Sequence, residues 1–228
     1  MNKFKENFKS NQEELKKIRN EINRNFITDK NKKKHPINQI KKLLLLSKSD
    51  GSTAQISDCI RKIHDFYGWM AKDAGRLLGG CSGCIYRTER FLEIDTNVRD
   101  GSKTTKRNIH VEHLVPVSML KKHILSSPLQ DPEELLTLLL SSSICVAMTH
   151  NEERKLDLNF VPKSSSPTVT LDFLDEEKPF LRYSPMVGPT SNKQNDFQVY
   201  DMVRGQIVDI QSFTFSDHRS NIYDLFNG

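Results

Sequence analysis

The chain has 228 residues, of which 36% are hydrophobic and 28% are charged. This composition favours a soluble globular protein over a disordered chain. No apolar run approaches the roughly 18 residues that are needed to cross a bilayer. The first residues, MNKFKENFKSNQEELKK, lack the apolar centre of a signal peptide. We therefore expect a cytoplasmic protein.

The net charge of +5 is unevenly distributed along the chain. Residues 1–45 hold 13 Lys and Arg against 5 Asp and Glu, a local balance of +8, whereas the rest holds 21 against 24, a balance of −3. A basic arm joined to a near-neutral body favours a polyanionic partner. Lysines 32–34, together with Lys41 and Lys42, are expected to contact a phosphate backbone. The alternative is a solvated helix with a lysine-rich face.

The N-terminal part of the chain is expected to be helical, because its apolar residues recur at spacings near multiples of 3.6. Pro36 ends the first helix, since proline excludes the helical conformation for the residue before it. The expected helices cover residues 3–26, 37–47, 54–66 and 67–80. Residues 1–80 are therefore predicted to form a helical, basic, DNA-binding region.

Residues 81–228 show a mixture of strand and helix patterns. Alternation of apolar and polar residues predicts a strand over 107–115, and a short apolar run predicts a second strand over 144–148. Asp131, followed by Pro-Glu-Glu, has the pattern of a helix start. The other expected elements are a helix over 150–156 and strands over 168–174, 197–202 and 207–215. The fold class is α+β, with a helical N-terminal region, a central β–β–α unit and a β-rich C-terminal portion.

Glu112 and His113 combine two groups that phosphodiester hydrolysis needs. A general base must take a proton from water, and a divalent metal must neutralise the charge that develops on the phosphate. Histidine suits the first role because its pKa lies near neutral pH, and carboxylate oxygens suit a Mg²⁺-like ion. Adjacent residues in a strand point to opposite faces. A shared site therefore requires a bend, which we expect at the loop that Pro116 opens.

These residues resemble a known nuclease family. Residues 111–116, VEHLVP, look like the first motif of the HNH, or ββα-metal, nucleases, in which an acidic residue and a histidine precede a hydrophobic pair and a proline. Residues 149–154, THNEER, resemble the helical half of the same unit. The resemblance covers residues 108–154. It implies a central ββα-metal unit within a nuclease domain at 81–228.

The resemblance implies a role for each matching residue. Glu112 and Asn151 would hold the catalytic divalent ion, His113 would be the general base, and Arg154 would contact phosphate. A different alignment of the helical half selects His150 as the final ligand in place of Asn151, and Glu153 is a third choice. His110 shares a strand face with Glu112, where it would either contact phosphate or be an ordinary exposed histidine.

The four cysteines are too few for a disulfide framework in a chain of this size. Cys81-x-x-Cys84 is half of a tetrahedral zinc site, which needs four ligands. In zinc-containing HNH relatives a second pair lies on the second strand, where this chain has Cys145. Cys59 would complete a four-cysteine structural zinc site, and His64 is another candidate ligand. The alternative is that these cysteines are free thiols.

The function that the resemblance implies is a metal-dependent endonuclease that cleaves double-stranded DNA and leaves a 5′-phosphate. Analogy to the family favours a sequence-specific restriction-type enzyme acting as a homodimer, so that two sites cut two strands. Homing, defence and toxin nucleases and RNases share the same core. The competing class is a non-catalytic nucleic-acid-binding protein that uses the basic helices and a zinc site.

Overall fold

The structure is a computed structural model that describes residues 3–22, 36–48, 53–69, 71–72, 76–77, 83–95, 108–126, 131–154, 178–183 and 197–227. Its helices are α1 (Lys3–Ile22), α2 (Pro36–Lys48), α3 (Thr53–Trp69), α4 (Glu89–Leu92), α7 (Val117–Ser126), α8 (Pro132–Ser142), the 3-10 helix η2 (Pro179–Tyr183) and α12 (Phe215–Asn227). Its strands are β1 (Ala71–Lys72), β2 (Arg76–Leu77), β3 (Tyr86–Thr88), β4 (Ile109–His113), β5 (Cys145–Thr149), β6 (Val199–Asp201) and β7 (Gln206–Ile207).

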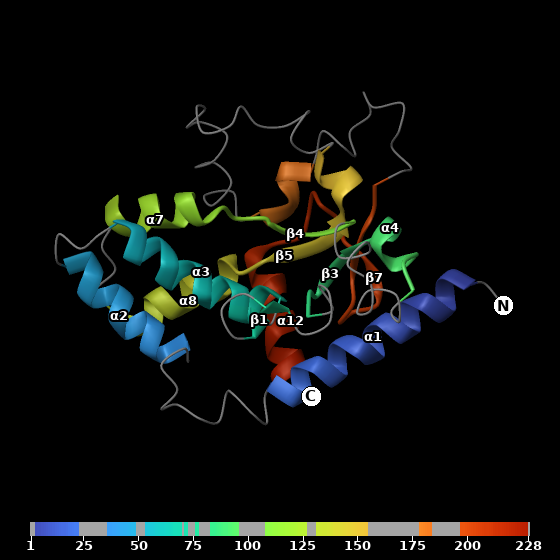
Figure 1. Ribbon diagram of the computed structural model, residues 1–228, viewed down its shortest axis with the longest axis horizontal. Helices are drawn as coiled ribbons and strands as arrows, with labels where there is room; N and C mark the ends of the chain where they lie inside the picture. The colour runs from blue at the N-terminus through green and yellow to red at the C-terminus, as the bar shows by residue number, and fades with distance from the viewer. Residues whose placement is uncertain are drawn as a thin grey trace.

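A five-stranded mixed sheet with the order β4-β5-β3-β6-β7 forms the centre of the fold (Figure 1). β4 and β5 are antiparallel, with Ile109 opposite Thr149 and His113 opposite Cys145. β5 and β3 are parallel, whereas β6 and β7 continue the sheet in antiparallel pairs. The first four residues of β5 are all buried, which agrees with its continuous apolar sequence. The chain is therefore α+β, as predicted.

Helices α2, α3, α7 and α8 gather on one side of the sheet, and α1 runs past α4 on the other side (Figure 1). The buried faces of α2, α3, α7 and α8 share one apolar core with the sheet, to which Ile60, Leu139 and Val146 belong. A smaller apolar cluster around Phe91 and Ala147 lies elsewhere against the sheet. Within the described parts of the chain, none of the helices combines the length and hydropathy that a membrane span requires.

Two buried arginines attach the basic helix α1 to the rest of the fold. Arg19 donates a hydrogen bond of 2.9 Å to the carbonyl oxygen of Gly83, and burial lowers its pKa to about 10. Arg87 on β3 donates to the side-chain oxygen of Asn11 and forms an ion pair of 3.2 Å with Glu14, both on α1. A guanidinium with a pKa near 10 remains charged at neutral pH, so the hydrogen bond from Arg19 is charge-assisted. α1 is therefore packed onto the sheet and does not project as a separate arm.

Several predicted elements are confirmed within the described residues. α1 follows the predicted helix as far as residue 22, and α2 and α3 match their predicted ranges to within three residues. β4 and β5 match the two predicted strands of the central unit. α8 starts as expected, because the side chain of Asp131 accepts a hydrogen bond of 3.0 Å from the backbone N–H of Glu133. The predicted strand over 168–174 lies outside the described residues.

The helix predicted over residues 67–80 is wrong at residues 71–72 and 76–77. These residues form the antiparallel pair β1 and β2, with Ala71 opposite Leu77. Pairing between the two segments therefore prevails over the apolar spacing that predicted a helix there.

The C-terminal portion is more helical than its β-rich composition predicted. β7 ends at Ile207, and Asp209 then closes a turn by accepting hydrogen bonds from the backbone N–H of Gln211 and the hydroxyl of Ser212. α12 begins with a capping box, in which the carboxylate of Asp217 accepts from the backbone N–H and the hydroxyl of Thr214. The strand predicted over 207–215 is wrong because these two local motifs end the extended conformation.

Candidate metal centre

Strand β5 pairs with β4 in antiparallel fashion and leads directly into a helical segment over residues 150–154. The backbone N–H of His150 donates a hydrogen bond of 3.0 Å to the carbonyl of Asn108, which keeps the start of this segment beside the start of β4. Thr149 and Glu152 form a capping box, since the carboxylate of Glu152 accepts from both the backbone N–H and the hydroxyl of Thr149 at 2.8 Å. The sequence Thr-His-Asn-Glu therefore specifies where this helical segment begins.

Three metal-ligating side chains converge where β4 meets helical segment 150–154. His110, His150 and Glu153 each offer one ligand atom, and these atoms lie within 4.8 Å of one another. Nδ1 of His150 lies 2.6 Å from Oε2 of Glu153, and Nδ1 of His110 lies 3.5 Å from Oε1 of the same carboxylate. Glu112 stands beside this ligand cluster, with its Oε2 3.3 Å from Nε2 of His110. One residue of β4 and two of helical segment 150–154 therefore form the ligand cluster, and Glu112 adjoins it through His110.

The spacing of these residues explains why they meet. His110 and Glu112 are two apart on a strand, so their side chains share one face of β4. His150 and Glu153 are three apart on a helical turn, so they are neighbours on its surface. All four side chains are between 15% and 36% exposed, which leaves the cluster accessible to ions and substrates. The i, i+3 spacing of His150 and Glu153 was the signal in the sequence that could have identified this pair.

The donor set of the ligand cluster fits a divalent transition metal better than Mg²⁺. Two imidazole nitrogens and one carboxylate oxygen suit ions such as Zn²⁺, Mn²⁺ or Fe²⁺. Mg²⁺ prefers an octahedral set of oxygens and keeps several waters. The alternative without a metal is a set of imidazole–carboxylate hydrogen bonds, in which each histidine would need a proton facing its carboxylate.

His113 and Glu112 lie on opposite faces of β4, because the strand stays regular to its last residue and His113 pairs with Cys145. The bend that a shared site requires is absent. Nε2 of His113 instead lies 3.1 Å from Oδ1 of Asp65 on α3, and its ring stacks on that of His64 with centroids 5.9 Å apart. The structure therefore brings Glu112 to the ligand cluster and places His113 in a separate imidazole–carboxylate pair.

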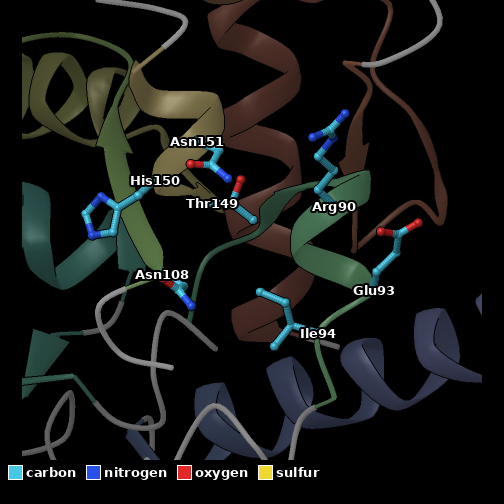
Figure 2. A pocket seen from close by; sticks show the side chains of 7 residues that line it. All are labelled: Arg90, Glu93, Ile94, Asn108, Thr149, His150 and Asn151. Atoms are coloured by element: carbon cyan, nitrogen blue, oxygen red, sulfur yellow. The ribbon is translucent and has the colours of Figure 1, made fainter. Parts of the chain in front are cut away.

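Asn151 and Arg154, the other two residues that the resemblance singled out, are exposed on helical segment 150–154. Asn151 lines a pocket of about 400 Å³ beside the ligand cluster. Figure 2 shows Asn151 and Thr149 on the side of the segment that is nearer to α4. Of the three choices for the final ligand, His150 and Glu153 are placed in the cluster.

The pocket, called here the Arg90 pocket, has two walls from separate parts of the chain (Figure 2). Its lining residues are Arg90, Glu93 and Ile94 from α4 and the residues after it, Asn108 before β4, and Thr149, His150 and Asn151. His150 belongs to both the pocket and the ligand cluster, so the two features adjoin. Nothing in the sequence pointed to Arg90, because α4 and β5 are far apart in the chain and the parallel pairing of β3 with β5 brings them together.

The buried side chain of Glu152 connects the two walls of the Arg90 pocket through hydrogen bonds. The side chain is 1% exposed, and its Oε2 accepts a hydrogen bond of 2.9 Å from the hydroxyl of Thr88, the N-cap of α4. The same oxygen accepts from Thr149, as described above. One buried carboxylate therefore holds the starts of α4 and of helical segment 150–154 at a fixed separation.

We expect the Glu152→Ala variant to lose about 2 kcal/mol of folding stability, because it removes a capping box and a buried hydrogen-bond acceptor. Its affinity for a divalent ion should fall by about 10- to 100-fold, since His150 and Glu153 are positioned by the turn that Glu152 caps. Urea unfolding and metal titration measure the two effects. Glu133→Ala, an exposed glutamate in the first turn of α8, is the matched control. An unchanged metal affinity in Glu152→Ala would contradict this positioning role.

The cysteines that were considered for structural zinc lie in separate places. Cys59 is buried in the large apolar core, whereas Cys84 and Cys145 belong to the smaller cluster, and Cys81 lies outside the described residues. Burial, followed by the neighbouring Cys84, raises the pKa of Cys145 well above its usual range and favours the neutral thiol. In the described ranges, no group of three metal-ligating side chains includes a cysteine. Cys59 is therefore not brought together with Cys84 and Cys145.

The packing around Cys145 and His64 favours an apolar and hydrogen-bonded interior. A Cβ on Gly68 would collide with the Sγ of Cys145, so the glycine allows α3 to approach β5 closely. His64, the other candidate zinc ligand, is fully buried, and its Nε2 lies 3.2 Å from the hydroxyl of Ser142. Burial lowers the pKa of His64 well below its usual value.

The lysines expected to contact a phosphate backbone are described only in part. Lys41 and Lys42 are exposed on α2, while lysines 32–34 lie outside the described residues. On α1, four more lysines are exposed, namely Lys5, Lys9, Lys16 and Lys17. Both basic helices therefore present cations to solvent.

Comparison of the chain with protein families, with curated proteins and with solved structures finds no match. The proposed function therefore rests on the arrangement of the side chains.

Proposed function

We propose that the protein is a metal-dependent phosphodiester hydrolase of the ββα-metal type, which acts as an endonuclease on DNA. The observation that supports this most is the convergence of His110, His150 and Glu153 from a β-hairpin and the helical segment that follows it. The ion would be held by these three side chains, in place of the pair Glu112 and Asn151 that the sequence favoured.

The chemistry of the cluster suits phosphodiester cleavage. A divalent ion in this position supplies Lewis-acid stabilisation of the phosphate oxygens and of the leaving oxygen. We assign the role of accepting a proton from water to Glu112, whose carboxylate lies next to the cluster, 3.3 Å from Nε2 of His110 on the same face of β4. The donor set leads us to propose Mn²⁺ or Zn²⁺ ahead of Mg²⁺.

The proposed substrate follows from charge. The exposed lysines of α1 and α2 lie in the part of the chain with a balance of +8, which would attract a polyanion. Sequence-specific cleavage by a homodimer remains part of the proposal, by analogy to the restriction-type members of the family that the motif resembles. A structural zinc site remains a proposal only if its ligands include Cys81, which lies outside the described residues.

Incubation of the purified protein with duplex DNA tests the function. We expect cleavage with Mn²⁺ or Zn²⁺, little or none after treatment with EDTA, and products that carry a 5′-phosphate. Discrete fragments would indicate sequence specificity, and a smear would indicate its absence. Binding without cleavage under every metal condition would instead support the non-catalytic binding protein.

Two variants separate the residues that could move the proton. We expect Glu112→Gln to bind metal and DNA but to lose cleavage, whereas His113→Ala, on the other face of β4, should keep it. Loss of cleavage in His113→Ala with metal and DNA binding intact would assign proton transfer to the His113–Asp65 pair, as the resemblance implied. Cleavage with product analysis and metal titration of both variants give the answer.

A further inference from the structure

The Arg90 pocket has the chemistry of a site for an anionic, partly aromatic ligand. Arg90 supplies a guanidinium whose fork of donors matches phosphate oxygens. Asn108 and Asn151 supply amides that can both donate and accept hydrogen bonds, and Ile94 supplies an apolar surface. His150, which belongs to the ligand cluster, lines the same pocket.

The size of the pocket limits what it can hold. A volume of about 400 Å³ lies in the lower part of the range for small-molecule sites. It suits one nucleotide and is too small for a stretch of duplex. Glu93 also lines the pocket and places a negative charge there. A phosphate would therefore be favoured next to Arg90 and disfavoured next to Glu93.

The pocket is also held in shape before a ligand arrives. Thr88 caps α4 by accepting a hydrogen bond from the backbone N–H of Phe91, and Thr88 donates to the buried carboxylate of Glu152. Glu152 in turn fixes Thr149 at the start of the opposite wall. A preformed site costs less entropy on binding than one that must be ordered.

We propose that the Arg90 pocket is the subsite for one nucleotide of the substrate, adjoining the phosphodiester bond at the ligand cluster. Arg90 binds the phosphate of that nucleotide, and Asn108 and Asn151 face its base or sugar. The proposal rests on the proposed function, since the cluster defines where the bond is cleaved. It assigns substrate binding to a residue of α4 that lies 60 positions before His150 in the sequence.

Binding of a mononucleotide tests the subsite without relying on cleavage. Thymidine 5′-monophosphate, thymidine and inorganic phosphate are titrated by calorimetry into the full-length protein, with and without Mn²⁺. We expect the monophosphate to bind at least about 10-fold more tightly than thymidine or inorganic phosphate, because only it engages both Arg90 and the amides. Equal binding of inorganic phosphate would reduce the pocket to an anion site and overturn the nucleotide assignment.

Arginine variants then locate the phosphate contact. We expect Arg90→Ala to weaken mononucleotide binding by about 10-fold or more, which corresponds to about 1.4 kcal/mol, and Arg90→Lys to recover part of that loss. Metal affinity should stay unchanged, and for DNA cleavage KM should rise more than kcat falls. Arg61→Ala, which removes an exposed arginine on α3, is the matched control. Mononucleotide binding in Arg90→Ala equal to that of the wild type would overturn the inference.

Failure of the proposed function and failure of the nucleotide subsite would give different results. A wild-type protein that binds neither Mn²⁺ nor Zn²⁺ would remove the proposed function, while the mononucleotide titration would still report on the pocket. A wild-type protein that binds metal and cleaves DNA, with an Arg90→Ala variant that has an unaltered KM, would leave the function standing and remove the subsite.

Discussion

The Glu153→Gln variant is expected to lose metal binding and metal-dependent cleavage together. Its carboxylate contacts both imidazoles of the cluster, at 2.6 Å from His150 and 3.5 Å from His110. An amide keeps the shape of the side chain but removes the negative charge that a divalent cation needs. We expect metal affinity to fall by more than about 100-fold, and cleavage to fall at least as far.

Calorimetric titration with Mn²⁺ and Zn²⁺ and a plasmid cleavage assay measure these effects. Glu134→Gln, an exposed glutamate in the first turn of α8, is the matched control and should behave like the wild type. His110→Ala and His150→Ala should reproduce the loss, whereas His123→Ala on α7 should not. Full metal affinity in Glu153→Gln would show that the cluster is only a set of hydrogen-bonded side chains.

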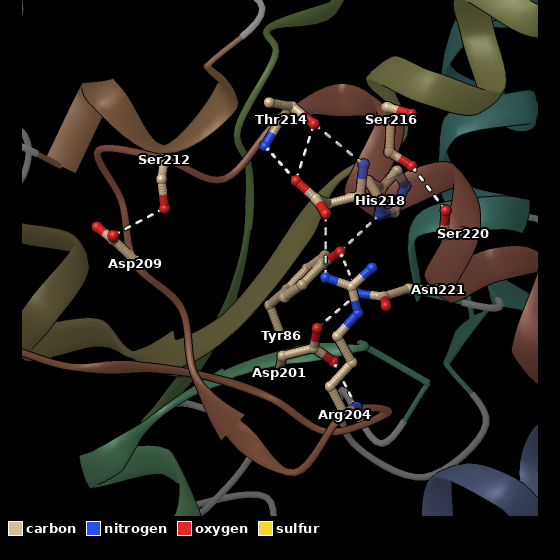
Figure 3. A network of polar contacts seen from close by, with 11 residues as sticks. Tyr86, Asp201, Arg204, Asp209, Ser212, Thr214, Ser216, His218, Ser220 and Asn221 are labelled. Carbon is tan, nitrogen blue, oxygen red and sulfur yellow. Dashed lines mark hydrogen bonds and ion pairs between the residues drawn. The ribbon is translucent and has the colours of Figure 1, made fainter.

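The second large effect is a loss of folding stability in mild acid. His218 on α12 is buried in a polar network that includes Tyr86 of β3. Its Nδ1 lies 2.9 Å from the hydroxyl of Tyr86 (Figure 3). Asn221 donates to the same hydroxyl and to the carboxylate of Asp201. Burial lowers the pKa of His218 to about 3, and it also lowers the pKa of His64 well below its usual value.

The direction of the effect follows from proton binding. An unfolded chain protonates these histidines at a pKa of about 6.5, whereas the folded protein keeps them neutral well below that pH. The unfolded state therefore binds more protons as the pH falls, and the free energy of unfolding drops. The slope approaches its limit of about 1.4 kcal/mol per pH unit only below pH 6.5, so each histidine contributes about 1.4 kcal/mol in total between pH 7.5 and 5.5. The two together should therefore cost about 3 kcal/mol over this interval.

Urea unfolding at pH 7.5 and 5.5 measures this slope. Replacement of His218 by Gln should remove about half of it, even though the variant is less stable at both pH values, while His123→Gln should leave the slope unchanged. Asp201 works in the opposite sense, because burial raises its pKa from 3.8 and the folded protein then binds its proton first. That offset in stability from Asp201 is largest at more acidic pH, which is why the measurement stops at 5.5.

A pH slope that does not change in His218→Gln would refute the assignment of this pH dependence to His218.

Local patterns in the sequence were sufficient for much of the central unit. The alternation around Ile109 and Val111 predicted β4 and also predicted that His110 and Glu112 share a face. The Asp131 N-cap predicted the start of α8. Two capping boxes, at Thr149 and Thr214, were present in the sequence as well. Neither enters the predictions of strands and helices, and the β-rich composition around Thr214 leads to the wrong strand prediction over 207–215.

The residue types at 110–113 and 150–154 were enough to identify the candidates for metal chemistry, because imidazoles and carboxylates are the side chains that ligate metal ions. How these side chains are grouped depends on the packing of the folded chain. The unbroken pairing of β4 with β5 separates His113 from Glu112, and α3 brings Asp65 to His113. The parallel pairing of β3 with β5 places Arg90 beside the cluster. Such contacts depend on sheet order and helix packing between segments far apart in the chain, and local spacing carries no record of either.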